Sequence, residues 1–149
     1  MYKRQLTERG LEQALALACN PALVQCMLLV VSPLSRAIQT AAAIFGEEPG
    51  CRTCLCALHT ERRNGAAACN KGSARTALAT RFPFVRAWEG FAELAEEWWP
   101  SVAADGDDGW RNIRVPALVT WLREQPERKV VVVGHGVSAA RAARRAAYV

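Results

Sequence analysis

The chain has 149 residues, with 19 lysines and arginines against 14 aspartates and glutamates, and its formal net charge is +5. Hydrophobic residues make up 51% of it and charged residues 22%, a globular composition that excludes a disordered or collagen-like chain. The length suits one domain covering residues 1–149. Two counts are unusual, because there are only two histidines, His59 and His135, and as many as five tryptophans.

The apolar segments are too short to cross a membrane. The longest run covers residues 26–31, whereas a bilayer requires roughly 20 apolar residues. Residues 1–7 contain no apolar signal core, so they do not resemble a secretory leader. We therefore expect a cytoplasmic protein with no membrane contact, and we expect its six cysteines to be mostly free thiols.

Basic residues gather in two places. Arg62 and Arg63 are adjacent, while Arg141, Arg144 and Arg145 share one face of a predicted helix. No aromatic residue alternates with these arginines, as a stacking platform for nucleic-acid bases requires. We interpret both groups as solvated surface and expect no nucleic-acid partner.

The first third of the chain predicts a helix, a strand and a second helix. Thr7 is a favourable N-cap for a helix over residues 8–19, whose apolar residues recur at helical spacing. The continuous apolar run at 26–31 is typical of a strand buried on both faces of a parallel sheet. Pro33 then begins a helix that ends at Gly46.

The rest of the chain continues this alternation. Residues 51–58 and 129–133 predict strands, and residues 73–81, 87–99 and 110–125 predict helices. Pro116 either kinks the last of these or marks its true start. A further helix follows residues 134–136 and runs to the end. Strands that alternate with helices predict an α/β fold with a parallel sheet, which binds ligands beyond the carboxyl ends of its strands.

Three side chains near that edge could carry chemistry. Arg36 lies in the first turn of a predicted helix, where an anion would bind, unless it is an ordinary surface arginine. His135 lies between two glycines and could contact a phosphate or transfer protons, or it could simply face solvent. Glu61 could be a general acid, although a surface glutamate paired with Arg62 or Arg63 is the simpler interpretation.

One rival interpretation fails on its residues, and a second, a zinc or redox module, is weaker. The Gly134-His135-Gly136 segment is similar to the strand–turn of a nucleophile elbow, but Ser138 lies two positions too late. Cys51, Cys54 and Cys56 suggest zinc, but a fourth ligand at regular spacing is missing. We interpret these cysteines as buried free thiols and expect no metal.

Five segments, taken in order, resemble the histidine phosphatase superfamily, the phosphoglycerate-mutase-like proteins. Residues 6–14 resemble its L-T-x-x-G-x-x-Q-A helix, and residues 32–41 resemble its S-P-L-x-R-A-x-Q-T-A segment, the most specific match. Residues 58–61 with Gly65 are similar to L-x-E…G, and residues 69–73 to C-D-x-G-S. Residues 131–136 resemble the late strand that ends in His-Gly.

The resemblance implies a three-layer α/β/α fold with a mostly parallel central sheet, and phosphomonoester hydrolysis or phosphoryl transfer through a phosphohistidine. By that match, Arg36 binds the phosphoryl oxygens, Glu61 donates a proton and His135 contacts the phosphoryl group. The implied partner is a phosphorylated small molecule or a phosphoprotein, with no cofactor. The resemblance does not indicate the exact substrate or the oligomeric state.

The chain departs from the pattern at its start. The family nucleophile belongs to an R-H-G motif at the end of a first strand, and no R-H-G occurs in these 149 residues. His59 does not match the nucleophile's position. We therefore expect a domain truncated at both ends, without its first strand and with unpaired sheet edges, and weakly active or inactive as given. The alternative is a pseudoenzyme that binds phosphoanions or protein partners without catalysis.

Overall fold

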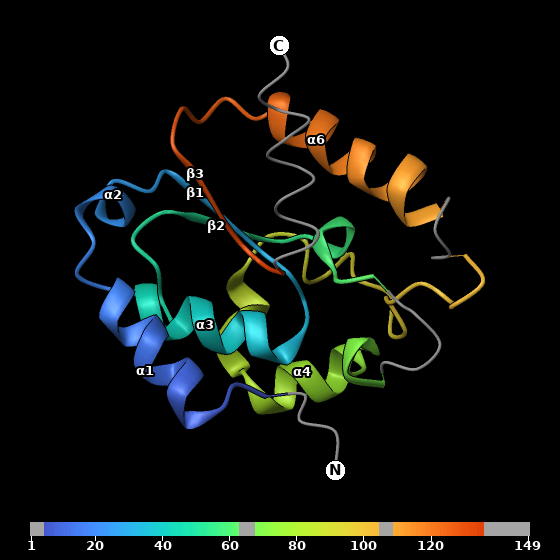
Figure 1. The fold of residues 1–149 in the computed structure, drawn as a ribbon, viewed down its shortest axis with the longest axis horizontal. Helices are drawn as coiled ribbons and strands as arrows, with labels where there is room; N and C mark the ends of the chain where they lie inside the picture. Colours follow the sequence, from blue (N-terminus) through green and yellow to red (C-terminus); the bar gives the residue numbers. More distant parts are fainter. Residues whose placement is uncertain (1–4, 63–67, 105–108, 136–149) are drawn as a thin grey trace.

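A computed structural model describes residues 5–62, 68–104 and 109–135, and its centre is a parallel sheet of three strands (Figure 1). The strand order is β2 (Arg52–Leu55), β1 (Leu28–Val31) and β3 (Val130–Val133). Leu28 lies opposite Arg52 on one side and Val130 on the other. All four residues of β1 are buried, which explains its uninterrupted apolar sequence. The predicted α/β fold with a parallel sheet is confirmed.

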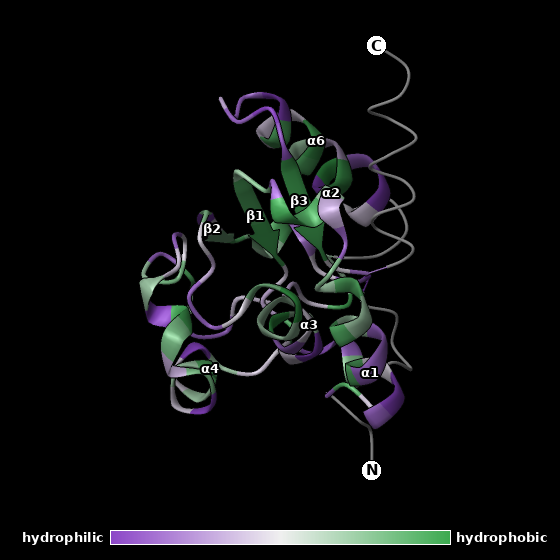
Figure 2. Ribbon diagram, turned by 90° about the vertical axis from the view of Figure 1, so that its left-hand side faces the viewer, coloured by the Kyte–Doolittle hydropathy of each residue, from purple (hydrophilic) through white to green (hydrophobic). Residues whose placement is uncertain are grey.

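Helices cover both faces of the sheet. In both orientations α6 (Val115–Arg123) lies on one face, and α1 (Glu8–Leu17), α3 (Ser35–Phe45) and α4 (Arg75–Arg81) lie on the other (Figures 1 and 2). The short helix α2 (Pro21–Val24) leads into β1.

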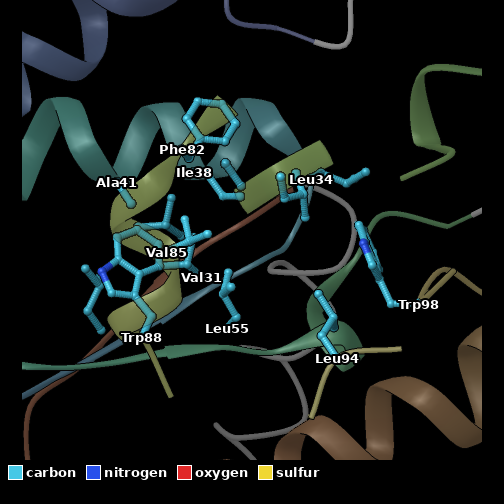
Figure 3. Packing of buried hydrophobic residues seen from close by; sticks show 14 residues of the cluster. Val31, Leu34, Ile38, Ala41, Leu55, Phe82, Val85, Trp88, Leu94 and Trp98 are labelled. Atoms are coloured by element: carbon cyan, nitrogen blue, oxygen red, sulfur yellow. The ribbon is translucent and has the colours of Figure 1, made fainter. Parts of the chain in front are cut away.

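Alternate residues of β1 supply two separate cores. Leu29 and Val31 belong to a cluster with Ile38 of α3 (Figure 3), whereas Leu28 and Val30 belong to a cluster with Leu118 of α6. Successive side chains of a strand point to opposite faces, so one short strand fills both interlayer spaces. The α/β/α layering follows from this arrangement.

Local hydrogen bonds account for the first helices. The Thr7 hydroxyl accepts a hydrogen bond from the backbone N–H of Gly10 at 3.1 Å, as predicted for an N-cap. The side chain of Asn20 caps α2 in the same way, through the N–H of Ala22. The Gln39 side chain on α3 accepts from the N–H of Leu6, which ties the start of α1 to its neighbour.

The predicted helix over residues 87–99 is wrong. A 3₁₀ helix, η3 (Pro83–Ala87), ends before it, and the following residues form turns. Glu89 instead makes a parallel bridge with Cys54: its N–H donates to Thr53 O at 2.9 Å, and its carbonyl accepts from Leu55 N at 2.8 Å. The backbone of Glu89 thereby satisfies the outer edge of β2, which a helix could not do.

The other expected elements are shorter than predicted. The strand at 51–58 ends at Leu55 and is followed by a 3₁₀ helix, η1 (Ala57–His59). The helix predicted at 110–125 begins as one turn of π-helix, η4 (Trp110–Arg114), and Pro116 lies in the first turn of α6. Pro116 therefore marks the start of the α-helix, the second of the two predicted possibilities. The helix predicted after residue 136 lies outside the described residues.

The outer edge of β3 has no strand beside it among the described residues. Three of its four valines are only partly buried, in contrast to the fully buried β1. In this described part of the chain, no helix has both the length and the apolar character of a membrane span.

Gly90 is a position where a side chain should disturb the fold, because both its backbone conformation and its surroundings favour glycine. Its φ is +79°, and a Cβ would lie 2.5 Å from the carbonyl oxygen of Leu55. We expect Gly90→Ala to lower the free energy of unfolding by about 2 kcal/mol in urea titrations. Gly50→Ala is the matched control, because nothing lies within 4 Å of a Cβ there, and equal losses in both variants would contradict this account.

Candidate functional site

Three polar side chains meet at the carboxyl edge of the sheet. Ser32 directly follows β1, Arg36 lies in the first turn of α3, and His135 comes two residues after β3. Arg36 Nη2 lies 3.2 Å from His135 Nδ1, and His135 Nε2 lies 3.0 Å from Ser32 Oγ. The structure therefore brings together Arg36 and His135, which are 99 residues apart in the chain.

The hydrogen bonds of His135 determine its tautomer. A guanidinium can only donate, so Nδ1 of His135 must accept from Arg36. The ring proton is then on Nε2 and is donated to the Ser32 hydroxyl. Burial first, and then the positive charge of Arg36, lower the pKa of His135 to about 3. His135 is therefore a neutral imidazole at pH 7.

Arg36 is held by neutral acceptors. Nη1 donates to the carbonyl of Cys69 at 2.9 Å, and Nη2 donates to Oδ1 of Asn70 at 3.0 Å. Asn70 in turn donates to the carbonyl of Arg62. Burial lowers the pKa of Arg36, and no carboxylate within the described ranges forms an ion pair with it. A half-buried guanidinium with only neutral partners favours an anionic ligand.

Glu61 follows η1 and is partly buried. One of its carboxylate oxygens accepts a hydrogen bond from the backbone N–H of Arg62 at 2.9 Å. Its negative charge is close enough to Arg36 to raise the pKa of that guanidinium electrostatically, which partly offsets the effect of burial. Glu61 thus belongs to the electrostatic surroundings of the Arg36–His135 pair.

Arg114 fixes the segment that carries Glu61. It extends from η4, is only 9% exposed, and its Nη1 donates to the carbonyl of Thr60 at 2.6 Å and to that residue's hydroxyl at 2.7 Å. Nη1 also donates to the carbonyl of Leu58 at 3.2 Å. These bonds pair two carbonyls of the segment that leads into Glu61, so Arg114 holds the path of the chain at this point.

His59 lies beneath the site rather than in it. Its ring is fully buried, with a centroid 6.3 Å from that of His135. A Cβ on Gly134 would collide with this ring, so the glycine before His135 is required by packing. Neither ring nitrogen has a hydrogen-bond partner among the described residues. Burial lowers the pKa of His59 to about 4, and the Arg114 charge contributes in the same direction.

Three residues that contribute to the site are not among the site residues predicted from the sequence. Ser32 and Asn70 lie inside segments that carry the family resemblance, so the motifs at 32–41 and 69–73 contained a usable signal. Arg114 has no such signal, because a buried arginine in a helical segment cannot be distinguished from an exposed one. Cys54 and Cys56 are buried free thiols, as predicted, but the prediction is wrong for the burial of Cys51, which is a free thiol that is only partly buried at the start of the sheet.

Comparisons with known proteins agree with this architecture. The model of the histidine phosphatase superfamily (branch 1) matches residues 4–147. A comparison with curated proteins found no match.

Among solved structures, mycobacterial hydrolase 1 is 24% identical with a TM-score of 0.55, and this chain covers 68% of it. Mycobacterial hydrolase 2 is 23% identical with a TM-score of 0.57, and the chain covers 60% of it. A mycobacterial glucosyl-3-phosphoglycerate phosphatase in complex with VO3 is 25% identical with a TM-score of 0.50, with 68% covered. Each match uses 95% of this chain. The family model spans nearly the whole sequence, and the chain therefore belongs to the histidine phosphatase superfamily (branch 1).

Proposed function

We propose that this chain binds the phosphoryl group of a phosphomonoester at Arg36 and His135, and that as given it hydrolyses or transfers that group weakly or not at all. The observation that carries the proposal is Arg36, a half-buried guanidinium whose partners in the described structure are all neutral acceptors. A phosphoryl dianion would supply the missing negative charge. The proposed ligand is a phosphorylated small molecule or a phosphoprotein in the cytoplasm.

Each site residue has a distinct role in this proposal. Arg36 would donate N–H groups to two phosphoryl oxygens, the geometry that a planar guanidinium favours. A dianion beside His135 would offset the cost of charging its buried ring, so that the ring could donate to a third oxygen. Glu61 would protonate the leaving oxygen as a general acid.

Weak turnover follows from the positions of the two histidines. A phosphohistidine route needs a ring nitrogen that is free to attack in line with the leaving oxygen. Both nitrogens of His135 are within hydrogen-bond distance of Arg36 and Ser32, and His59 has no exposed surface. We infer binding without an efficient covalent step.

Calorimetric titration with inorganic phosphate tests the binding role. We expect Arg36→Ala to weaken phosphate affinity at least tenfold, which corresponds to about 1.4 kcal/mol. Arg86→Ala is the matched control, because it removes the same charge from an exposed position on η3. A similar loss of affinity in both variants would mean that net charge, and not this site, binds the anion.

Hydrolysis of a generic aryl phosphate tests the second half of the proposal. We expect no release of phosphate above that of the Arg36→Ala variant. Robust activity that is abolished by His135→Ala but kept by His59→Ala would show that the chain has a working catalytic route. Phosphate binding without hydrolysis is the result that the proposal expects, and it is shared by the pseudoenzyme alternative, a phosphoanion-binding or interaction module.

A further inference from the structure

We propose that Cys26 and Cys51 form a dithiol modification site, which a small disulfide oxidises to an intramolecular disulfide. The two sulfur atoms lie 3.6 Å apart, and the Cys51 thiol donates a hydrogen bond to Cys26. All six cysteines are free thiols in the structure. The proposal does not depend on phosphate binding, because the pair lies at the opposite end of the sheet.

The sheet register holds the two cysteines together. Cys26 comes two residues before β1 and Cys51 one residue before β2, and these parallel strands pair with Leu28 opposite Arg52. Continued by one residue, this register places Met27 opposite Cys51, so Cys26 is offset from Cys51 by one residue. Strands about 4.8 Å apart and a rise of about 3.3 Å per residue give a Cα separation of about 6 Å, which is within the range of about 4.4–6.8 Å that a disulfide spans. Closing the sulfur distance to about 2.05 Å needs side-chain rotation and only a small backbone shift.

The pair of thiols can be reached by a small molecule from one side. Both residues are partly buried and pack against the core cluster of the α3 face. Cys51 also lines a surface hollow of about 370 Å³ with Glu47, Glu48 and Arg52. A small oxidant can therefore reach the sulfur of Cys51, and a neutral one avoids repulsion by the two carboxylates.

The two thiols differ in reactivity. Burial and the neighbouring Cys51 raise the pKa of Cys26 to about 11, so its thiolate is scarce at pH 7 and it is a poor first nucleophile. Cys51 lines the hollow that admits the oxidant, and Cys26 is not among the residues that line it, so Cys51 attacks first. Cys26 resolves the mixed disulfide because it is already in contact with it.

The reaction balances as two thiol–disulfide exchanges. The Cys51 thiolate attacks one sulfur of the small disulfide, whose other half leaves as a thiolate and takes a proton. The Cys26 thiolate then attacks the Cys51 sulfur and releases the second half in the same way. The two cysteines lose two electrons and two protons in total, and one small disulfide is reduced to two small thiols.

Peptide mapping after treatment with the neutral 2-hydroxyethyl disulfide tests the proposal. The map is made in a Cys19→Ser background, because Cys19 is exposed and lies in the same tryptic peptide as Cys26. In this background Cys26 is the only cysteine of peptide 10–36, and Cys51 is the only cysteine of peptide 37–52. We expect the folded chain to lose two thiols and to yield these two peptides linked. Adding Cys26→Ser or Cys51→Ser should abolish the link.

Several outcomes would overturn the proposal. These are unlinked hydroxyethyl adducts on both cysteines, a link between two molecules on a non-reducing gel, or no oxidation of either thiol. If the serine variants fail to fold, the map of the Cys19→Ser chain still decides. Phenylarsine oxide, which bridges paired thiols, supplies a second measurement, and it should bind the Cys19→Ser chain with one arsenic per molecule.

Discussion

An Arg114→Met variant is expected to unfold with a free energy about 3 kcal/mol below that of the parent chain. Arg114 is 9% exposed, and its guanidinium donates to the carbonyls of Leu58 and Thr60 and to the Thr60 hydroxyl. Methionine fills much of the same volume but donates nothing, so these oxygens lose the hydrogen bonds that Arg114 supplies. Hydrogen bonds to a charged group contribute about 1.5–3 kcal/mol each, and an unsatisfied buried acceptor costs about 1–3 kcal/mol.

The neighbouring Arg111→Met variant is the matched control. Arg111 lies on the same π-helical turn but is exposed, so its replacement should change the free energy of unfolding by less than about 0.5 kcal/mol. Urea titrations at pH 7 measure both variants. Equal losses would mean that loss of charge from this turn, and not the buried contacts, accounts for the effect.

Arg114 also acts on the site through Glu61. Its bonds end on the residues directly before Glu61, so the same variant should loosen the segment that carries this carboxylate. Arg114 is thus a positioning residue in the proposed site. Proteolysis or hydrogen exchange confined to residues 57–61 would detect this loosening in a variant that is still folded.

The strands and the helices near them could be predicted from the sequence because their patterns arise from burial on the sheet. The run at 26–31 is buried because β1 lies between two strands and two helical layers. The helix predicted at 87–99 shows the limit of this reasoning. Trp88, Leu94 and Trp98 are indeed buried, but apolar spacing reports which residues are buried and not which backbone bonds they make. The edge of β2 takes Glu89, and the helical pattern is lost.

The residues of the site also divide into those that the sequence predicts and those that it does not. Arg36 and His135 could be predicted because the carboxyl ends of parallel strands meet at one edge. The roles of Arg114 and His59 come from contacts between elements that the local sequence does not encode. Arg111 and Arg114 look alike in the sequence, and only the π-helical turn decides which of them is buried.

The two buried histidines predict a second large effect, at acid pH. The folded pKa of His59 is about 4 and that of His135 about 3, against an ordinary value of 6.5. In both cases burial is the main cause, and positive charge adds to it, from Arg114 at His59 and from Arg36 first at His135. As the pH falls below about 6.5, the unfolded chain binds protons at both rings while the folded chain does not. The stability that these two neutral histidines contribute is therefore fully present above about pH 6.5 and is lost as the pH falls towards about 4 and below.

The expected slope follows from the number of protons. Each histidine contributes up to about 1.4 kcal/mol per pH unit in this range, so the pair should cost about 2 kcal/mol between pH 6 and pH 5. His59→Leu removes one of the two histidines and should therefore remove about half of this loss of stability. The carboxylates titrate alike in the variant and in the parent chain, so their contribution cancels when the two stabilities are subtracted. Urea titrations at pH 7, 6 and 5 measure it, with His59→Phe as a second apolar replacement. Parallel stability curves for His59→Leu and the parent chain would show that His59 is not held neutral by the fold.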